Sequence, residues 1–436
     1  MDRRTGMERI QQLAAGLTLL LLMLGDAVAP IRITASVSVS AAVTALLTYG
    51  FLLLLPAISF LTRGSKQKST EPRQPRKVPK ILWIFLAWAL MDTVTHGTGV
   101  KALQNISCYF LFVGSIQAFS RLSEKYDIRF AKAVVILGWL RATVYAVELG
   151  LDGFGAAGVF PRRSFAIQAL LIMAVMIPFG GNNRWCRLLP FVLLLEITLS
   201  GSRTAMAVGA VLLSLSMRSS GVVRLSRTAF RAALIGLAGY FALILSPDLQ
   251  ERFFSGDLAW NVQGVPLNAE GRAILWSIVT EHAQSNPWTG FGAGSASHVI
   301  NEVLGTQDQP HNEYLRLWHD FGYIGLGLWL IGYLLLMVRC WQGTRGHSTG
   351  GAAPHYAALL ALLGIGLMAI TDNVFVYYYA MVPLGAMVGI SLAQPGPDTE
   401  RRSPTRPAAC GRPRTNWESE GALLGRELRR TTLKGS

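Results

Sequence analysis

The sequence is poor in charged residues and in cysteine for a chain of its length. Asp, Glu, Lys and Arg make up 15% of the 436 residues, and hydrophobic residues make up 51%. A water-soluble domain carries about 25% charged residues, so this composition excludes an ordinary soluble enzyme. The few cysteines include no close pair, and we expect neither a disulfide nor a thiolate metal site. They are Cys108, Cys186, Cys340 and Cys410.

Several motifs that carry common chemistry are also missing. The sequence contains no Gly-x-Ser-x-Gly motif, no Walker loop and no dinucleotide fingerprint. The segments expected outside the membrane contain no Asp-x-Asp pair and no His/Cys cluster with metal-ligand spacing. We therefore expect neither a dedicated metal site nor an organic cofactor.

Long apolar runs predict an all-α polytopic membrane protein with about 12 transmembrane helices, because about 20 apolar residues span a bilayer. The run Ile10–Gly25 is interpreted as a first span rather than a signal peptide. The expected spans are 10–27, 40–62, 81–96, 102–120, 132–150, 165–182, 188–200, 204–218, 232–247, 321–340, 356–371 and 375–394.

The net charge of +15 follows the expected topology. Lys and Arg are retained in cytoplasmic loops, and an inside N-terminus places most basic residues in such loops. Both termini are then cytoplasmic. These basic segments would also attract anionic lipid headgroups. No motif indicates a nucleic-acid partner. The crowded cytoplasmic segments are 63–80, 121–132, 184–187, 218–231 and the tail.

One loop between expected spans is far longer than the others. Together with the basic tail, it divides the chain into four expected parts. The N-terminal transmembrane helices occupy 1–246, an extracytoplasmic catalytic loop 247–318, the C-terminal transmembrane helices 319–394, and a disordered basic tail 395–436. Loops this long are usually functional or disordered. This loop is rich in aromatic residues, and Gly271–Glu281 has helical spacing. We expect it to contain short helices and most of an active site.

Two arginines are candidates for binding an anion at the outer face. Arg272 lies in the first turn of the helix expected in the loop, where free backbone amides favour an anion. Arg203 lies in Ser-Gly-Ser-Arg-Thr (200–204), at the outer joint between two short apolar segments. A guanidinium can bond two phosphate oxygens at once. The alternatives are a solvated helix residue for Arg272 and a snorkelling residue for Arg203.

Four histidines are candidates for an acid or base, because histidine is the side chain best matched to taking a proton near neutral pH. His311 begins the segment 310–325, where the loop re-enters the membrane as a helix. On composition alone His319 could equally be the functional histidine, and His282 and His298 are further candidates. A single loop histidine is more often a structural hydrogen-bonding residue.

Four motifs follow one another along the chain: Ser-Gly-Ser-Arg-Thr (200–204), Gly-Arg-Ala-Ile-Leu-Trp (271–276), Asn-Pro-Trp-Thr-Gly-Phe-Gly (286–292) and Pro-His-Asn-Glu-Tyr-Leu (310–315). In this order they resemble the bacterial O-antigen ligase and polymerase superfamily. The resemblance covers roughly Phe165 to Ile390. It implies a helical fold of the GT-C type at the periplasmic face of the inner membrane. It also implies glycan transfer from an undecaprenyl-pyrophosphate donor to a sugar hydroxyl, without a metal or nucleotide sugar.

The resemblance assigns roles to matching residues. His311 would activate the acceptor hydroxyl, and Arg203 and Arg272 would bind the pyrophosphate. Fixed cations stabilise the charge that develops on such a leaving group.

Other residues are possible supports for this site. Asp372, in Thr-Asp-Asn (371–373), would orient an arginine or the acceptor, or simply cap a helix. Glu313 and Arg316 lie near His311 in sequence, and His319 is the alternative base.

The acceptor distinguishes the two enzymatic functions that the resemblance implies. The His-Asn…Gly-x-x-Gly spacing favours a ligase that uses lipid A–core as acceptor. The alternative is a Wzy-type O-antigen or exopolysaccharide polymerase, whose acceptor is a growing glycan. A flippase or transporter of lipid-linked sugars would be expected to have broken helices and charged residues at the bilayer midplane. A membrane scaffold would leave the candidate arginines and histidines unexplained.

Arg141 and Glu196 lie within or near spans and are expected to pair with each other.

Overall fold

The computed structural model describes only part of the chain. The expected spans at 10–27, 40–62 and 232–247, and the tail 395–436, lie outside the described residues, apart from two glycines. The described residues are 78–96, 99–120, 125–152, 160–179, 184–215, 259–262, 265–268, 272–305, 309–346 and 352–394, with Gly16 and Gly50.

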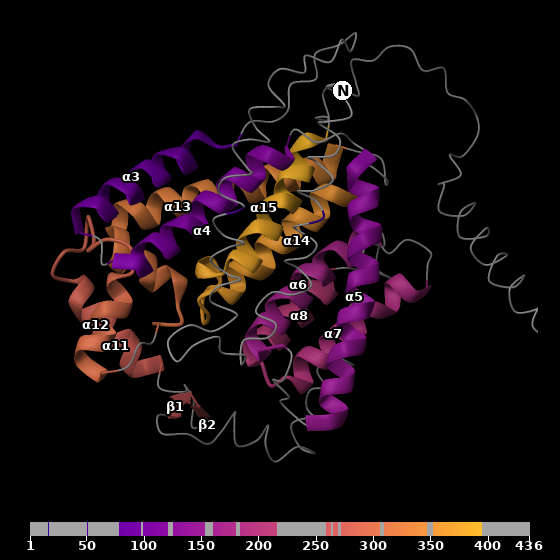
Figure 1. Ribbon diagram of the computed structural model, residues 1–436, viewed down its shortest axis with the longest axis horizontal. Helices are drawn as coiled ribbons and strands as arrows, with labels where there is room; N and C mark the ends of the chain where they lie inside the picture. The colour runs from indigo at the N-terminus through magenta and orange to yellow at the C-terminus, as the bar shows by residue number, and fades with distance from the viewer. Residues whose placement is uncertain are drawn as a thin grey trace, which may run out of the picture. The chain divides into compact units, whose positions relative to one another are not determined.

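The N-terminal half of the described chain is helical, as predicted from its apolar runs (Figure 1). Each of the six helices overlaps one expected span. The helices are α3 (Lys80–His96), α4 (Gly99–Phe119), α5 (Lys125–Asp152), α6 (Arg162–Phe179), α7 (Arg184–Leu199) and α8 (Arg203–Leu215).

The expected outer loop contains the two short helices α11 (Arg272–Ala283) and α12 (Ser295–Leu304). It also contains a feature that was not predicted, the antiparallel pair of β1 (Ala259–Val262) and β2 (Val265–Asn268), in which Trp260 is opposite Leu267. The prediction of short helices in this segment is confirmed, and the strands add a small ribbon before them.

The C-terminal part contains α13 (Glu313–Gly346), α14 (Ala353–Met368), the 3-10 turn η1 (Val374–Val376) and α15 (Tyr378–Ala393). The helix expected at 321–340 begins earlier, at Glu313, because Asn312 caps it: its Oδ1 accepts hydrogen bonds from the amides of Tyr314 and Leu315 at 3.1 and 3.0 Å. The expected loop boundary at residue 318 therefore falls inside α13.

Three helical segments among the described residues are long and apolar enough to cross a bilayer: Phe130–Leu151, Arg162–Phe179 and Glu313–Arg345. Three shorter apolar helices accompany them, which are Arg203–Leu215, Ala353–Met368 and Tyr378–Ala393. The helical membrane architecture is supported, and the number of 12 spans stays a prediction.

Glycines bring α4 and α15 into close contact, and the two helices lie side by side in Figure 1. A Cβ at Gly385 would lie 2.6 Å from the carbonyl oxygen of Phe112, and one at Gly389 would lie 2.8 Å from that of Ile116. Apolar side chains gain little from leaving lipid, so small residues that let backbones approach are a main source of attraction between membrane helices.

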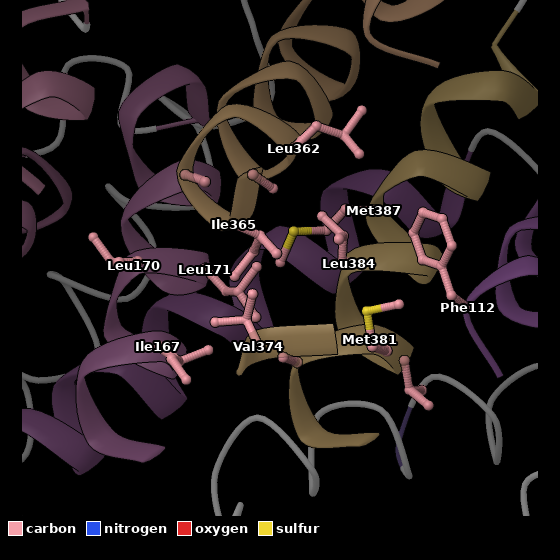
Figure 2. Packing of buried hydrophobic residues seen from close by; sticks show 14 of the residues in the cluster. Phe112, Ile167, Leu170, Leu171, Leu362, Ile365, Val374, Met381, Leu384 and Met387 are labelled. Atoms are coloured by element: carbon pink, nitrogen blue, oxygen red, sulfur yellow. The ribbon is translucent and has the colours of Figure 1, made fainter. Parts of the chain in front are cut away.

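The core joins helices that are distant in sequence. Leu171 of α6, Ile365 of α14 and Leu384 of α15 are buried against one another's helices (Figure 2). Beside them, Trp329 of α13 is fully buried and its ring centroid lies 4.9 Å from that of Tyr109 in α4. This packing fixes the ends of α6, α13 and α14, where the candidate site lies.

Candidate functional site

His311 lies just before the first turn of α13 in an unusual backbone conformation. Its φ is +50°, and among the described residues it is the only one other than glycine with a positive φ. The conformation costs about 1–3 kcal/mol and persists only where the surrounding structure imposes it. The residue is 8% exposed. The backbone therefore directs a mostly buried imidazole to one fixed place.

Three side chains from two other segments surround this imidazole. The Asn373 amide nitrogen lies 2.9 Å from His311 Nδ1, and Asp372 Oδ1 lies 3.9 Å from the same atom. From the first turn of α6, Arg163 Nη1 lies 3.3 Å from Nδ1 and 3.5 Å from Nε2. The ring thus has a carboxylate, an amide and a guanidinium around it.

Asp372 is held as a carboxylate. Burial acts to raise its pKa, but the contact with His311 and the positive charge of Arg163 outweigh burial and lower the pKa below its usual value. The backbone amide of Asn373 also donates to Asp372 Oδ1 at 2.8 Å. A negative charge is therefore available beside His311.

Arg203 is the first residue of α8, and the structure ties this helix start to Asp372. Thr204 Oγ1 lies 2.6 Å from Thr371 Oγ1. Arg203 is half-buried. This contact places the residue after Arg203 against the residue before Asp372.

Arg272 is the first residue of α11, as its sequence position predicted. One helical turn later, Trp276 Nε1 donates a hydrogen bond to the carbonyl oxygen of Pro310 at 2.6 Å. Residues four apart lie on the same helix face. The face of α11 that begins with Arg272 is therefore anchored to the residue immediately before His311.

Glu313 and Arg316 form a buried ion pair. Both are completely buried, and Arg316 binds Glu313 through Nε at 2.8 Å and through Nη2. Arg316 also donates to Tyr109 Oη at 2.7 Å and contacts Asp320 at 3.5 Å. Glu313 Oε1 accepts from the amide of Phe375 at 2.8 Å. The buried ion pair therefore connects α13 to α4 through Tyr109 and to η1 through Phe375.

His319 belongs to a second cluster. It is completely buried, its Nε2 lies 2.9 Å from His282 Nδ1, and its Nδ1 lies 3.1 Å from Ser295 Oγ. His298 is exposed and lies 3.2 Å from Glu302. Of the four candidate histidines, His311 is the one that lies beside Asp372.

The sequence gave no role to Arg163 or Asn373, which both contact His311. Arg163 belongs to none of the motifs, and Asn373 entered only as the neighbour of Asp372 in Thr-Asp-Asn (371–373). No local pattern links either residue to His311, because Arg163 lies 148 positions away.

The expected partnership of Arg141 and Glu196 is part of a larger group. The charge of Arg141 interacts with those of Glu148 and Glu196. Its guanidinium carbon also lies 4.1 Å from the ring centre of Phe160, whose amide donates to Glu148 at 3.3 Å. This group lies among α5, α6 and α7, because Arg141 also lies 5.3 Å from the ring centre of Phe165 in α6.

Among the residues that the structure describes, no group of three or more His, Cys, Asp or Glu side chains could hold a metal ion. The guanidinium of Arg163 is a cation that contacts the candidate base.

Residues 188–330 match a family model described as O-antigen ligase. This range includes α8, α11, α12 and His311, whereas Arg163 and Asp372 lie outside it. No curated protein matches the chain. The match supports a function of the glycan ligase or polymerase type in a bacterial membrane. It confirms the resemblance deduced from the motifs: residues 188–330 are similar to the O-antigen ligase family.

Proposed function

We propose that the protein transfers a glycan from an undecaprenyl-pyrophosphate donor to a sugar hydroxyl at the periplasmic face of the inner membrane. The proposed activity is that of an O-antigen ligase, with lipid A–core as acceptor. The observation that carries the proposal is the position of His311, a strained and mostly buried histidine 3.9 Å from the carboxylate of Asp372. The helix starts that carry Arg203 and Arg272 are tied to the same place.

In the proposed reaction, His311 takes the proton from the acceptor hydroxyl. The hydroxyl oxygen then bonds to the anomeric carbon of the donor sugar, and the bond from that carbon to the pyrophosphate oxygen breaks. The leaving pyrophosphate keeps the electron pair and later receives a proton. Asp372 stabilises the imidazolium that forms on His311, because opposite charges at such short range attract strongly in a partly buried site.

The arginines balance the charge of the leaving group. Arg203 and Arg272 each occupy the first position of a helix, where a positive side chain opposes the helix dipole. A bound anion removes this conflict and gains hydrogen bonds from the free backbone amides. Two guanidiniums placed in this way suit a pyrophosphate, whose charge increases as the bond to the sugar breaks. A metal ion is not required by this scheme.

Reconstitution tests the proposal. The purified full-length protein in lipid vesicles would receive an undecaprenyl-pyrophosphate glycan together with either lipid A–core or a second donor molecule. Ligation to lipid A–core that continues in EDTA supports the proposal. Chain extension with the second donor instead identifies a polymerase, and movement of the donor across the bilayer without transfer identifies a transporter. Either of these outcomes overturns the ligase assignment.

A further inference from the structure

The helix α13 is broken at Gly322, directly before its long apolar part. Gly322 has φ +66° and ψ −175°, so the chain changes direction there before the helix resumes. A helix of 34 residues is about 51 Å long, whereas the hydrocarbon core of a bilayer is about 30 Å thick. Membrane helices tilt by up to about 40°, which still leaves α13 too tall for the core. Part of α13 therefore lies outside the hydrocarbon core.

The exposed side chains of α13 after the break form an apolar stripe. Between Tyr323 and Trp341, every exposed residue of this helix is apolar. Their spacing places them along one side of the helix. A continuous apolar stripe on a helix long enough to cross a bilayer is a surface for lipid acyl chains. The residues between the two ends are Ile324, Ile331, Leu334, Leu335 and Val338.

An exposed aromatic residue stands at each end of this stripe. Tyr323 and Trp341 are 18 positions apart, which is about 27 Å along a helix. This separation is close to the thickness of the hydrocarbon core, and Trp and Tyr are enriched at both membrane–water interfaces. Beside Trp341, the guanidinium carbon of Arg345 lies 3.9 Å from the ring centre, as expected for a cation at the level of the headgroups.

Trp288 extends the aromatic end at Tyr323 beyond α13. Its side chain is 66% exposed, although its ring packs edge-on against Tyr323 with the centroids 5.6 Å apart. Trp318 stacks on Tyr323 at 5.1 Å, and its Nε1 donates a hydrogen bond to the carbonyl oxygen of Pro287 at 3.2 Å. Three aromatic residues therefore gather where the apolar stripe ends.

The backbone of the turn 286–292 is attached to the break itself. A helix start leaves its first amides without helical partners. Here the amide of Tyr323 donates to the carbonyl oxygen of Pro287 at 2.8 Å, and the amide of Ile324 donates to that of Trp288 at 3.3 Å. Such amides are costly to leave unpaired at the edge of the hydrocarbon core. The turn is therefore held at the level where the apolar part of α13 begins.

We propose that Gly322 lies at the boundary of the hydrocarbon core and that Trp288 is an interfacial anchor, which holds the turn 286–292 on the phospholipid headgroups. The occupant of the exposed indole is the lipid surface, because the indole continues the lipid-facing stripe of α13. The turn joins α11 to α12, so the anchor keeps both helices close to the membrane surface. This membrane contact is independent of the proposed glycan transfer.

Fluorine NMR tests the proposal on the full-length protein, labelled with fluorotryptophan in nanodiscs of phosphatidylethanolamine and phosphatidylglycerol. The chain has 11 tryptophans, and Trp288→Phe, Trp341→Phe and Trp329→Phe each identify one resonance by its loss. Three paramagnetic probes then report depth: a nitroxide near the top of the acyl chain, a nitroxide at the chain end, and a gadolinium chelate in water. Trp288 and Trp341 should broaden most with the upper nitroxide, and the buried Trp329 should broaden less with it.

Other patterns of broadening overturn the proposal. If the aqueous chelate broadens Trp288 and neither nitroxide does, the indole faces water; a shift of this resonance with soluble core oligosaccharide would then identify a glycan platform. If the nitroxide at the chain end has the strongest effect, the boundary of the core lies elsewhere on α13. Equal broadening of Trp288 and Trp329 by the upper nitroxide would show that the effect does not depend on exposure to the interface.

Cysteine labelling measures the same boundary without an aromatic probe. Cys108, Cys186 and Cys340 are buried, and Cys410→Ser removes the remaining thiol. In this background, Ile324→Cys in nanodiscs should react with a charged maleimide about tenfold or more slowly than His298→Cys, because the reactive thiolate forms poorly in an apolar environment. His298 is exposed on α12 and is the matched control. Equal rates for the two cysteines would place Ile324 in water and overturn the proposal.

Discussion

Thr204 Oγ1 and Thr371 Oγ1 lie 2.6 Å apart, so the residue after Arg203 is hydrogen-bonded to the residue before Asp372. The two threonines are 167 positions apart, one at the start of α8 and the other after α14. The contact brings a helix start that carries a cation to the loop that carries the partner of His311. A site assembled in this way depends on how α8 and α14 pack.

Replacement of either anion-binding arginine should weaken donor binding. We expect Arg203→Ala and Arg272→Ala each to lower kcat/KM about 10²-fold, because one charge-assisted contact with the pyrophosphate contributes about 2–3 kcal/mol. Lysine at either position should restore part of the rate. The control is Arg345→Ala, which removes an exposed arginine that lies over Trp341 at the far end of α13. Equal rates in all three alanine variants would contradict the assignment.

His311→Ala should abolish transfer while the protein still inserts and folds. A general base accelerates the chemical step about 10²–10⁴-fold, so the transfer rate of the variant should be lower than that of the unaltered protein by about this factor. The measurement is glycan transfer by reconstituted protein, with folding checked by thermal unfolding in detergent. His298→Ala, which removes an exposed histidine, is the control. If His311→Ala retains full activity, the base is another residue, and His319 is the next to test.

Arg316→Met should destabilise the protein more than any change at the surface of the site. The substitution leaves Glu313 and Asp320 buried without their cation. Removal of one partner from a buried ion pair costs about 3–5 kcal/mol. The expected result is a clear drop in the thermal midpoint. The double change Glu313→Gln with Arg316→Met should recover part of the loss, and no recovery would show that the ion pair is not the cause.

Gly322→Ala should disturb the 286–292 turn. Gly322 has φ +66° inside α13, and a Cβ there would overlap the carbonyl oxygen of Trp288. We expect a loss of about 1–3 kcal/mol in stability, because both the backbone conformation and the close approach require glycine. Gly327→Ala in the same helix is the control, since a Cβ at Gly327 meets no atom within 4 Å. Equal stability of the two variants would contradict this role.

Stability should fall as the pH drops below about 6.5. Burial lowers the pKa of His282, and the neighbouring His319 lowers it further. The unfolded chain then binds a proton at a higher pH than the folded chain does. His282 therefore contributes stability that is present above the unfolded pKa and is lost as the pH falls through the lowered folded value. The thermal midpoint should decrease less on acidification in His282→Gln than in the unaltered protein, and an unchanged decrease would exclude His282 as the cause.

The sequence alone predicted the features that depend on neighbouring residues. Apolar runs predicted where the described membrane helices lie, because hydropathy is a local property, although α5 and α13 begin well before the spans expected at 132–150 and 321–340. The start of α11 at Arg272 and the place of His311 before a helix followed from helical spacing. The order of four motifs predicted the family that matches residues 188–330.

Only the tertiary structure decided which side chains surround His311. The sequence offered four histidines and gave Glu313 and Arg316 the same standing as Asp372, yet the structure buries that ion pair and places Asp372 beside the imidazole. Arg163 had no signal at all, because its contact joins α6 to a residue 148 positions later. Contacts of this kind depend on the packing of α6, α13 and α14 around one core, and no local pattern in the chain encodes them.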